Sequence, residues 1–254
     1  MLSKGLIKLV NSLKHKKYRQ QHGLFVAEGH KMIGDLIKIG SPIKTIISAQ
    51  NINMNGAFEF VQCKSGELDK ISSLKTSQDM IALVKIPEYQ YKEEAILDKL
   101  SLALDSVQDP GNMGTIIRIA NWFGINNILC SFDCVDIYNP KVVQASMGAL
   151  MKVKVHYLDL CKTIEQLAKN TGYEIYGTFM ETDSIYELEL LPRGLIVMGS
   201  EGHGISTKIE KLITKKIAIP SFAAEFGGAE SLNVAVATGI IVSEFARQKQ
   251  ELRN

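Results

Sequence analysis

Hydrophobic and polar residues alternate along the second half of the chain in blocks that predict strands followed by helices. Short apolar runs, such as residues 194–200 (GLIVMGS), have the length of buried strands, whereas residues 115–123 carry apolar side chains at helical spacing. Buried strands that alternate with helices predict a mostly parallel sheet covered on both faces. The predicted strands are residues 101–105, 126–131, 153–157, 173–179, 194–200 and 216–219, and the predicted helices are residues 115–123, 140–150, 160–170, 207–213 and 234–245.

The first ninety residues show a less regular alternation of the same kind. Apolar spacing predicts helices at residues 5–14, 30–40 and 65–74 and strands at residues 23–29, 43–48, 58–63 and 80–86. This order predicts a small α/β domain. The polar segment PEYQYKEEAILDK follows it, so we place the boundary near residues 88–97, between a domain of residues 1–90 and a domain of residues 97–254.

The last predicted helix has an unusually wide apolar surface. Val234, Ile241 and Phe245 share one face, and Val236 and Ile240 add a second apolar strip. A surface of this width favours packing on two sides, against the core and against a partner subunit.

Bulk composition is that of a soluble globular protein. Of 254 residues, 46% are hydrophobic and 22% are charged, and no run approaches the roughly 20 apolar residues that span a bilayer. The N-terminal segment is too interrupted by charge to be a signal peptide. We therefore expect a protein without a membrane segment.

The four cysteines, at positions 63, 130, 134 and 161, form no paired framework. No second pair or histidine cluster completes a zinc set beside Cys130 and Cys134, so we expect free buried thiols and no bound metal. Free thiols indicate a reducing compartment, which predicts a cytoplasmic protein.

The net charge of +2 conceals a basic N-terminal segment. The first 20 residues hold six basic side chains and no acidic one: Lys4, Lys8, Lys14, Lys16, Lys17 and Arg19. Such a cluster attracts polyanions, most often nucleic-acid phosphates, although a solvated helix face explains the same pattern equally well.

Three loops with unusual polar and glycine content each follow a predicted strand. The first is DPGNMGTIIR, in which Asn112, Gly114 and Arg118 form the pattern N-x-G-x-x-x-R. The second, MGSEGHGIS, brackets Glu201 with glycines, and the third, GGAESLNV, carries Ser231 and Asn233. In an open parallel sheet, ligands bind at the carboxyl ends of the strands, so these loops are expected at one edge.

Simpler explanations exist for each loop taken alone. Ser231 and Asn233 are typical of a capped helix start. Glycines in most loops serve only to let the backbone turn and bind no ligand. A lone arginine such as Arg118 usually faces solvent. The glycines do not fit the familiar nucleotide folds: G-x-G-x-x-G does not follow the first strand, and G-K-S or G-K-T is absent. An ordinary dinucleotide-binding dehydrogenase is therefore not indicated.

The three motifs in this order resemble those of the SpoU group of SPOUT methyltransferases, and the resemblance covers essentially the whole chain. Residues 1–90, with KKYRQQHGLFVAEG, are similar to the substrate-binding domain of many such enzymes, which has a ribosomal-protein-like α/β fold. The resemblance implies methyl transfer from S-adenosylmethionine to a ribose 2′-hydroxyl in ribosomal or transfer RNA. It also implies a deep trefoil knot in the C-terminal domain, a rare exception among folds.

The resemblance also implies residue roles. Backbone groups at Gly199, Ile219 and Leu232, with Thr178 as a weaker candidate, would hold the cofactor, and the last helix would pair two copies into a homodimer. Structured RNA would bind the basic segment, for which the candidates are Lys14, Lys16, Lys17 and Arg19.

Arg118 is the candidate for the chemistry itself. The family proposal makes this arginine the base, but guanidinium is almost never deprotonated, so it is better read as a group that binds phosphate and developing alkoxide. Asn112, Ser231 and Asn233 would orient the loops, the ribose or Arg118, and Glu201 would fix Arg118 or face the RNA.

One segment departs from the family pattern. SFAAEFGGA, residues 221–229, is longer than the loop that the family pattern predicts there. Two alternatives stay open: a catalytically silent RNA-binding or ribosome-assembly protein, and a SPOUT enzyme that methylates a base. Intact polar motif residues argue against the first, and N-x-G-x-x-x-R argues against the second. Ribosomal RNA is the first choice of substrate and transfer RNA the second.

Overall fold

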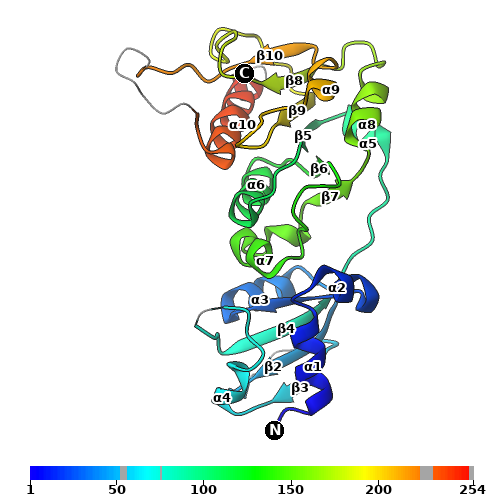
Figure 1. The fold of residues 1–254 in the computed structure, drawn as a ribbon, viewed down its shortest axis with the longest axis vertical. Coiled ribbons are helices and arrows are strands. Elements are labelled where there is room, and N and C mark those ends of the chain that lie inside the picture. Colours follow the sequence, from blue (N-terminus) through cyan, green and yellow to red (C-terminus); the bar gives the residue numbers. More distant parts are fainter. Residues whose placement is uncertain (52–55, 75, 224–230, 252–254) are drawn as a thin grey trace. The chain divides into compact units, whose positions relative to one another are not determined.

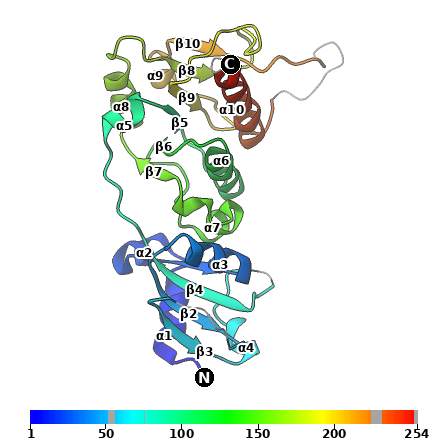
Figure 2. The ribbon, with the colours of Figure 1, turned by 180° about the vertical axis from the view of Figure 1, so that it is seen from behind.

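The computed structural model describes residues 1–51, 56–74, 76–223 and 231–251, so residues 224–230 of the lengthened loop lie outside the described part. The chain divides into two compact units (Figures 1 and 2). The first contains residues 1–88 and 136–151, and the second contains residues 89–135 and 152–254. Residues 136–151, which the sequence analysis assigned to the C-terminal domain, thus belong by their contacts to the first unit.

The first unit is built on a four-stranded sheet in the order β1-β4-β2-β3. β4 runs antiparallel to both β1 and β2, and β3 runs parallel to β2. Its strands are β1 (Leu24–Glu28), β2 (Ile43–Ser48), β3 (Glu59–Gln62) and β4 (Met80–Lys85). Its helices are α1 (Lys4–Ser12), α2 (Lys16–His22), α3 (His30–Lys38), α4 (Ser65–Leu68) and α7 (Pro140–Ser146), followed by a short 3-10 turn (Ala149–Met151).

Two helices of this unit differ from the sequence prediction. The predicted helix at residues 65–74 is only the four-residue α4, and α2 was not predicted at all. Apolar spacing did not predict α2 because this helix has no apolar stripe. Arg19 is its only buried side chain. The core lies between the sheet and α1, where Val10 and Leu13 pack with Ile47 and Leu83.

The second unit is built on a six-stranded sheet in the order β10-β8-β9-β5-β6-β7, and every neighbouring pair is parallel. The predicted parallel sheet is therefore confirmed. Its strands are β5 (Leu100–Leu104), β6 (Asn127–Cys130), β7 (Lys154–Tyr157), β8 (Ile175–Thr178), β9 (Gly194–Met198) and β10 (Lys215–Ile217). Its helices are α5 (Glu93–Leu97), α6 (Pro110–Trp122), α8 (Leu160–Leu167), α9 (Thr207–Glu210) and α10 (Val234–Glu251).

Helices cover both faces of this sheet (Figure 1). On one face, Ile164 of α8 and Ile209 of α9 join the core formed by β5, β8 and β9. α6 and α10 lie side by side on the other face, where Gly239 approaches Ile119 and the ring of Phe245 packs edge-on against Tyr176 at 4.9 Å between centroids. The trefoil knot stays a prediction. Across the described residues, no helix is both long and apolar enough to cross a membrane.

Candidate active site

The first motif lies on a helix and not in a loop. α6 begins at Pro110, and the side chain of Asp109 accepts a hydrogen bond from the backbone N–H of Asn112 at 2.8 Å. An aspartate cap and a proline in the first turn are strong helix-start signals, because they satisfy or remove unpaired N–H groups. The prediction that the turn extends to Gly114 was therefore wrong, and Asn112 and Gly114 lie on the first turns of α6.

The side-chain amide of Asn112 joins the three motif segments. Its Nδ2 donates to Oε1 of Glu201 in the loop after β9, and its Oδ1 accepts from Nδ2 of Asn233 at 2.9 Å. Both ends of one amide are thus used, each toward a different loop. The expectation that the three loops meet at one edge of the sheet is confirmed.

Asn233 serves two purposes at once. Its Oδ1 accepts from the backbone N–H groups of Ala235 and Val236, at 3.0 and 3.3 Å, and so caps α10. Its Nδ2 reaches Asn112. The capping interpretation and the site interpretation of this residue are therefore compatible.

The loop that carries Glu201 is a tight backbone turn. Ser200 and Gly204 exchange two backbone hydrogen bonds of 3.1 and 2.9 Å. A Cβ atom at Gly199 would overlap the backbone of Gly204, so only glycine fits at the end of β9. This close approach fixes where Glu201 leaves the sheet.

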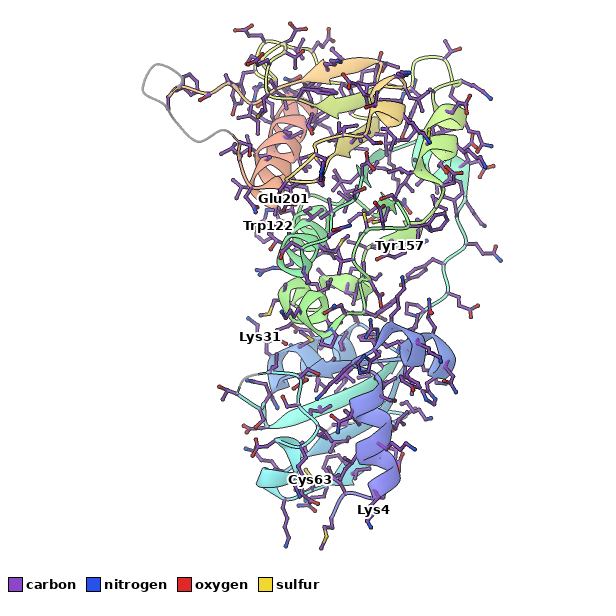
Figure 3. All side chains as sticks on the ribbon, in the orientation of Figure 1. Lys4, Lys31, Cys63, Trp122, Tyr157 and Glu201 are labelled. Carbon is purple, nitrogen blue, oxygen red and sulfur yellow. The ribbon has the colours of Figure 1, made fainter. Side chains whose placement is uncertain are left out.

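Arg118 is exposed on α6, beyond the turn that holds Asn112. Within the described residues its guanidinium has no hydrogen-bonding or ionic partner, and Glu201 contacts Asn112 and not Arg118. Trp122, one turn later on α6, is 84% exposed (Figure 3). Trp122 was not predicted from the sequence as a site residue, although its spacing of four residues from Arg118 places both on one side of the helix.

The cofactor candidates lie at the ends of neighbouring strands. Thr178 ends β8 and Gly199 follows β9, while Ile219 lies two residues beyond β10. β8 is paired with both β9 and β10. The hydroxyl of Thr178 donates to the backbone oxygen of Val197 at 3.1 Å, so this side chain is already engaged.

Two further candidates precede α10. Leu232 is 49% exposed, and Ser231 is exposed with no hydrogen bond from its hydroxyl to any part of the chain that the structure describes. The structure therefore brings Asn112, Glu201 and Asn233 into contact and leaves Ser231 outside that network.

Asp105 was missed as a site residue. It ends the apolar run of β5 and is 95% buried, and its Oδ2 accepts from the backbone N–H of Ser206 at 2.7 Å. Its own N–H donates to the oxygen of Met198 at 2.9 Å. Asp105 thus ties the segment before α6 to the segments around β9. A carboxylate directly after a buried strand was the available signal.

Among the RNA-binding candidates, the prediction for Arg19 must be corrected. Its guanidinium is buried, binds Asp136 at 2.5 and 3.1 Å, and donates to the backbone oxygens of Leu13 and Lys14 at 2.8 and 3.0 Å. A side chain engaged in this way is not available to phosphate. Arg19 is the buried side chain of α2, whereas the aromatic Tyr18 of the same helix is 39% exposed.

The lysine candidates differ from one another. The Nζ of Lys14 donates to the backbone oxygen of Ser72 at 2.9 Å, whereas Lys16 and Lys17 are exposed on α2. Formal charge is divided between the units: the first has 14 basic and 8 acidic residues, and the second has 15 basic and 19 acidic residues. The net charges are therefore +6 and −4, a contrast that the overall +2 conceals.

Two family models match the chain. The SpoU rRNA Methylase family model matches residues 99–243, and the MRM3-like substrate binding domain model matches residues 4–82. The first match covers more than half of the 254 residues. The chain belongs to the SpoU rRNA methylase family, so it is an RNA methyltransferase.

Individual relatives share the architecture. The 23S rRNA (guanosine-2′-O-)-methyltransferase RlmB of Escherichia coli K12 is 32% identical over 191 residues, covering 72% of this chain and 76% of RlmB. A solved structure from Porphyromonas gingivalis, described as of the TrmH family of RNA methyltransferases, has TM-score 0.85 at 35% identity over 98% of this chain and 99% of that one. AviRb of Streptomyces viridochromogenes, a SpoU methyltransferase solved with AdoMet, has TM-score 0.84 at 22% identity over 98% and 99%, which shows a shared fold.

Proposed function

We propose that the chain transfers the methyl group of S-adenosylmethionine to a ribose 2′-hydroxyl of ribosomal RNA. The observation that carries this proposal is the Asn112 amide, which joins Glu201 and Asn233 on the helix that also carries the exposed Arg118. Three motif segments of an RNA methylase family thus form one connected site. The name of the Escherichia coli relative, a ribosomal RNA 2′-O-methyltransferase, supports the same reaction.

The strand ends fit a cofactor held by backbone groups. Thr178, Gly199 and Ile219 follow three neighbouring strands, and the turn after Gly199 is so close that a side chain there would overlap the backbone. Such a surface leaves N–H and C=O groups free to contact a ligand. When bound, S-adenosylmethionine supplies an electrophilic methyl group.

Arg118 would act on the acceptor side. A guanidinium is an N–H donor and not a base in proteins, so Arg118 would bind the RNA phosphate and the negative charge that develops on the 2′-oxygen, while the phosphate accepts the proton. Arg118 is exposed and has no protein partner among the described residues, which leaves its five N–H donors available for this contact.

Asn112, Glu201 and Asn233 would act by holding geometry. Methyl transfer requires the 2′-oxygen, the methyl carbon and the sulfur in line, and alignment of this kind can lower a barrier by roughly 7 to 11 kcal/mol at most. The amide of Asn112 is hydrogen-bonded to the start of α10 and to the Glu201 turn. These bonds link the positions of the three segments.

The first unit would recognise the RNA. Its net charge of +6, together with the exposed Lys16 and Lys17 on α2, provides the electrostatic attraction that phosphate backbones require. The match of residues 4–82 to a substrate-binding domain supports this assignment.

A homodimer through α6 and α10 completes the proposal. Trp122 and Val236 are 84% and 53% exposed on these helices. A shallow hollow of about 430 Å³ lies beside them, lined by Phe123, Tyr186, Gly239, Ile240, Ser243 and Glu244. Exposed aromatic residues beside a shallow hollow of mixed polarity are typical of protein interfaces, and a second copy of this chain presents the same surface.

The direct test is methyl incorporation from tritiated S-adenosylmethionine into separate transcripts of 23S ribosomal RNA, small-subunit ribosomal RNA and transfer RNA. We expect label in the 23S transcript, in a 1:1 ratio with RNA at completion. Label confined to transfer RNA would overturn the ribosomal assignment. Cofactor binding without label in any RNA would contradict the proposed methyltransferase activity and favour a catalytically silent RNA-binding protein.

A further inference from the structure

Residues 131–151 form a continuous segment, here called the strap, that belongs to both units in turn. Its first five residues follow β6 in the second unit, and the remainder, including α7, lies in the first unit. The two parts of the strap are held by different sets of contacts.

The first part of the strap is hydrogen-bonded to the segment that leads into α6. The hydroxyl of Ser131 accepts from the N–H of Ser106 at 2.9 Å, and a carboxylate oxygen of Asp133 accepts from the hydroxyl of Ser106 at 2.5 Å. The N–H of Val135 donates to the oxygen of Val107 at 3.0 Å. Residues 104–107 are thus fixed to the strap immediately before Asp109 caps α6.

Ser106 is held in a costly conformation at this point. Its φ is +61°, a left-handed value that few residues other than glycine adopt. The hydrogen bonds from Ser106 and Ser131 also hold the pKa of Asp133 below its usual range, as expected for an ionised carboxylate that organises a turn. The Ser106–Asp133 contact therefore sets the backbone path toward Asn112.

The second part of the strap is built into the first unit. Asp136 receives the buried guanidinium of Arg19, and the ring of Tyr138 packs against Phe25 of β1 at 4.9 Å between centroids. α7 then buries Val142 and Val143. Loss of either member of this pair would leave a buried charge without its partner, so this part is firmly attached to the unit that we assign to RNA binding.

No residue separates the two anchors, because Val135 binds Val107 and the next residue, Asp136, binds Arg19. We propose that the strap couples RNA binding by the first unit to the placement of α6, with Asp133 and Asp136 as positioning residues for methyl transfer. This inference rests on the proposed function. It requires only the continuity of the chain and the contacts within each unit.

The test uses the full-length protein and an unmodified 23S ribosomal RNA transcript. Variants Asp133→Ala and Asp136→Asn break one anchor each, and Asp133→Asn keeps an acceptor for the serine hydroxyls. Asp159→Ala and Glu67→Gln are matched controls, because these carboxylates also accept backbone N–H groups, in α8 and near α4, but do not contact the strap. Each variant is assayed for RNA affinity, cofactor affinity, single-turnover rate and hydrogen exchange of residues 104–109.

For wild type, we expect bound RNA to slow amide exchange of residues 104–109. In Asp133→Ala and Asp136→Asn, RNA and cofactor affinities should stay within about twofold, while the single-turnover rate at saturation falls about tenfold and the RNA-dependent protection disappears. Asp133→Asn should recover most of the rate, and both controls should match wild type. In Asp133→Ala, a purely structural role would instead lower RNA affinity or folded yield.

Wild-type rates with retained protection in Asp133→Ala would overturn the coupling and leave the proposed function intact. Because Asp133 is exposed, Asp133→Ala is informative even where Asp136→Asn does not fold. Failure of the wild-type protein to bind or methylate any RNA would instead overturn both the proposed function and this inference.

Discussion

The side-chain amide of Asn233 donates to the side-chain oxygen of Asn112 at 2.9 Å, across 121 residues of sequence. This hydrogen bond joins the first turns of α6 and α10, the two helices that lie side by side on one face of the parallel sheet. The opposite end of the Asn112 amide reaches Glu201. One side chain therefore contacts both of the other motif segments.

Replacing Asn112 should impair catalysis more than folding. Asn112→Ala removes two partly exposed hydrogen bonds, each worth about 0.5 to 1.5 kcal/mol, so the melting temperature should fall by only a few degrees. The single-turnover methylation rate should fall about tenfold to hundredfold, because the loops lose their common tie. Asn121→Ala, at an exposed position of the same helix, is the control. Equal rates for the two variants would contradict this role.

Alanine substitution should be harmful at one glycine near Glu201 and harmless at another. A Cβ at Gly199 would overlap the backbone of Gly204, whereas a Cβ at Gly202 has no atom within 4 Å. Gly199→Ala should therefore destabilise the fold by about 1 to 3 kcal/mol and weaken S-adenosylmethionine binding, measured by calorimetry. Gly202→Ala should change neither quantity. Normal cofactor affinity in Gly199→Ala would argue against a backbone cofactor site at this turn.

Trp122 should be an anchor of the proposed homodimer. Trp122→Ala should raise the dimer dissociation constant at least about tenfold in sedimentation experiments, because exposed tryptophans dominate interface energies. The chain has a single tryptophan, so wild-type emission should shift to shorter wavelength as the dimer forms. Phe132→Ala, at an aromatic residue that is 68% exposed on the turn after β6, is the control. Unchanged association in Trp122→Ala would place the dimer surface elsewhere.

Buried His156 should make the second unit sensitive to acid. Burial, with Lys154 nearby, lowers the pKa of His156, which lies on β7 and contacts Asn127 at 3.3 Å. The unfolded chain, with a histidine pKa of about 6.5, then binds the proton first, so the free energy of unfolding should fall as pH drops below that value. Urea titrations at several pH values measure this. The decline should weaken in His156→Gln and persist in His203→Gln, because His203 is exposed.

Much of the fold was predictable because local pattern and tertiary structure agree. β9 is a continuous apolar run that is buried along its whole length, and burial on both faces is what such a run requires. α2 was not predictable in this way, because its helix depends on one buried arginine whose partner, Asp136, lies 117 residues away. The grouping of residues 136–151 with the first unit could not be predicted either, because it depends on contacts such as Arg19–Asp136 between segments far apart in sequence.

The site was predictable as a set of motifs and less so as geometry. Helix-start signals at Asp109 and Pro110 were present but were read as a turn. The Asn112 amide could not be foreseen as the common partner of Glu201 and Asn233, because amide hydrogen bonds across 89 and 121 residues depend on the folded sheet.

The most direct test of ribose methylation is the chemical position of the transferred methyl group, compared between wild type and Arg118→Ala. Tritiated 23S transcript is hydrolysed in alkali, which spares the phosphodiester bond next to a 2′-O-methyl ribose. We predict label in one alkali-resistant dinucleotide with wild type, and a rate lower by about a hundredfold or more with Arg118→Ala at unchanged cofactor affinity. Label released in mononucleotides, or an undiminished rate in Arg118→Ala, would contradict the account.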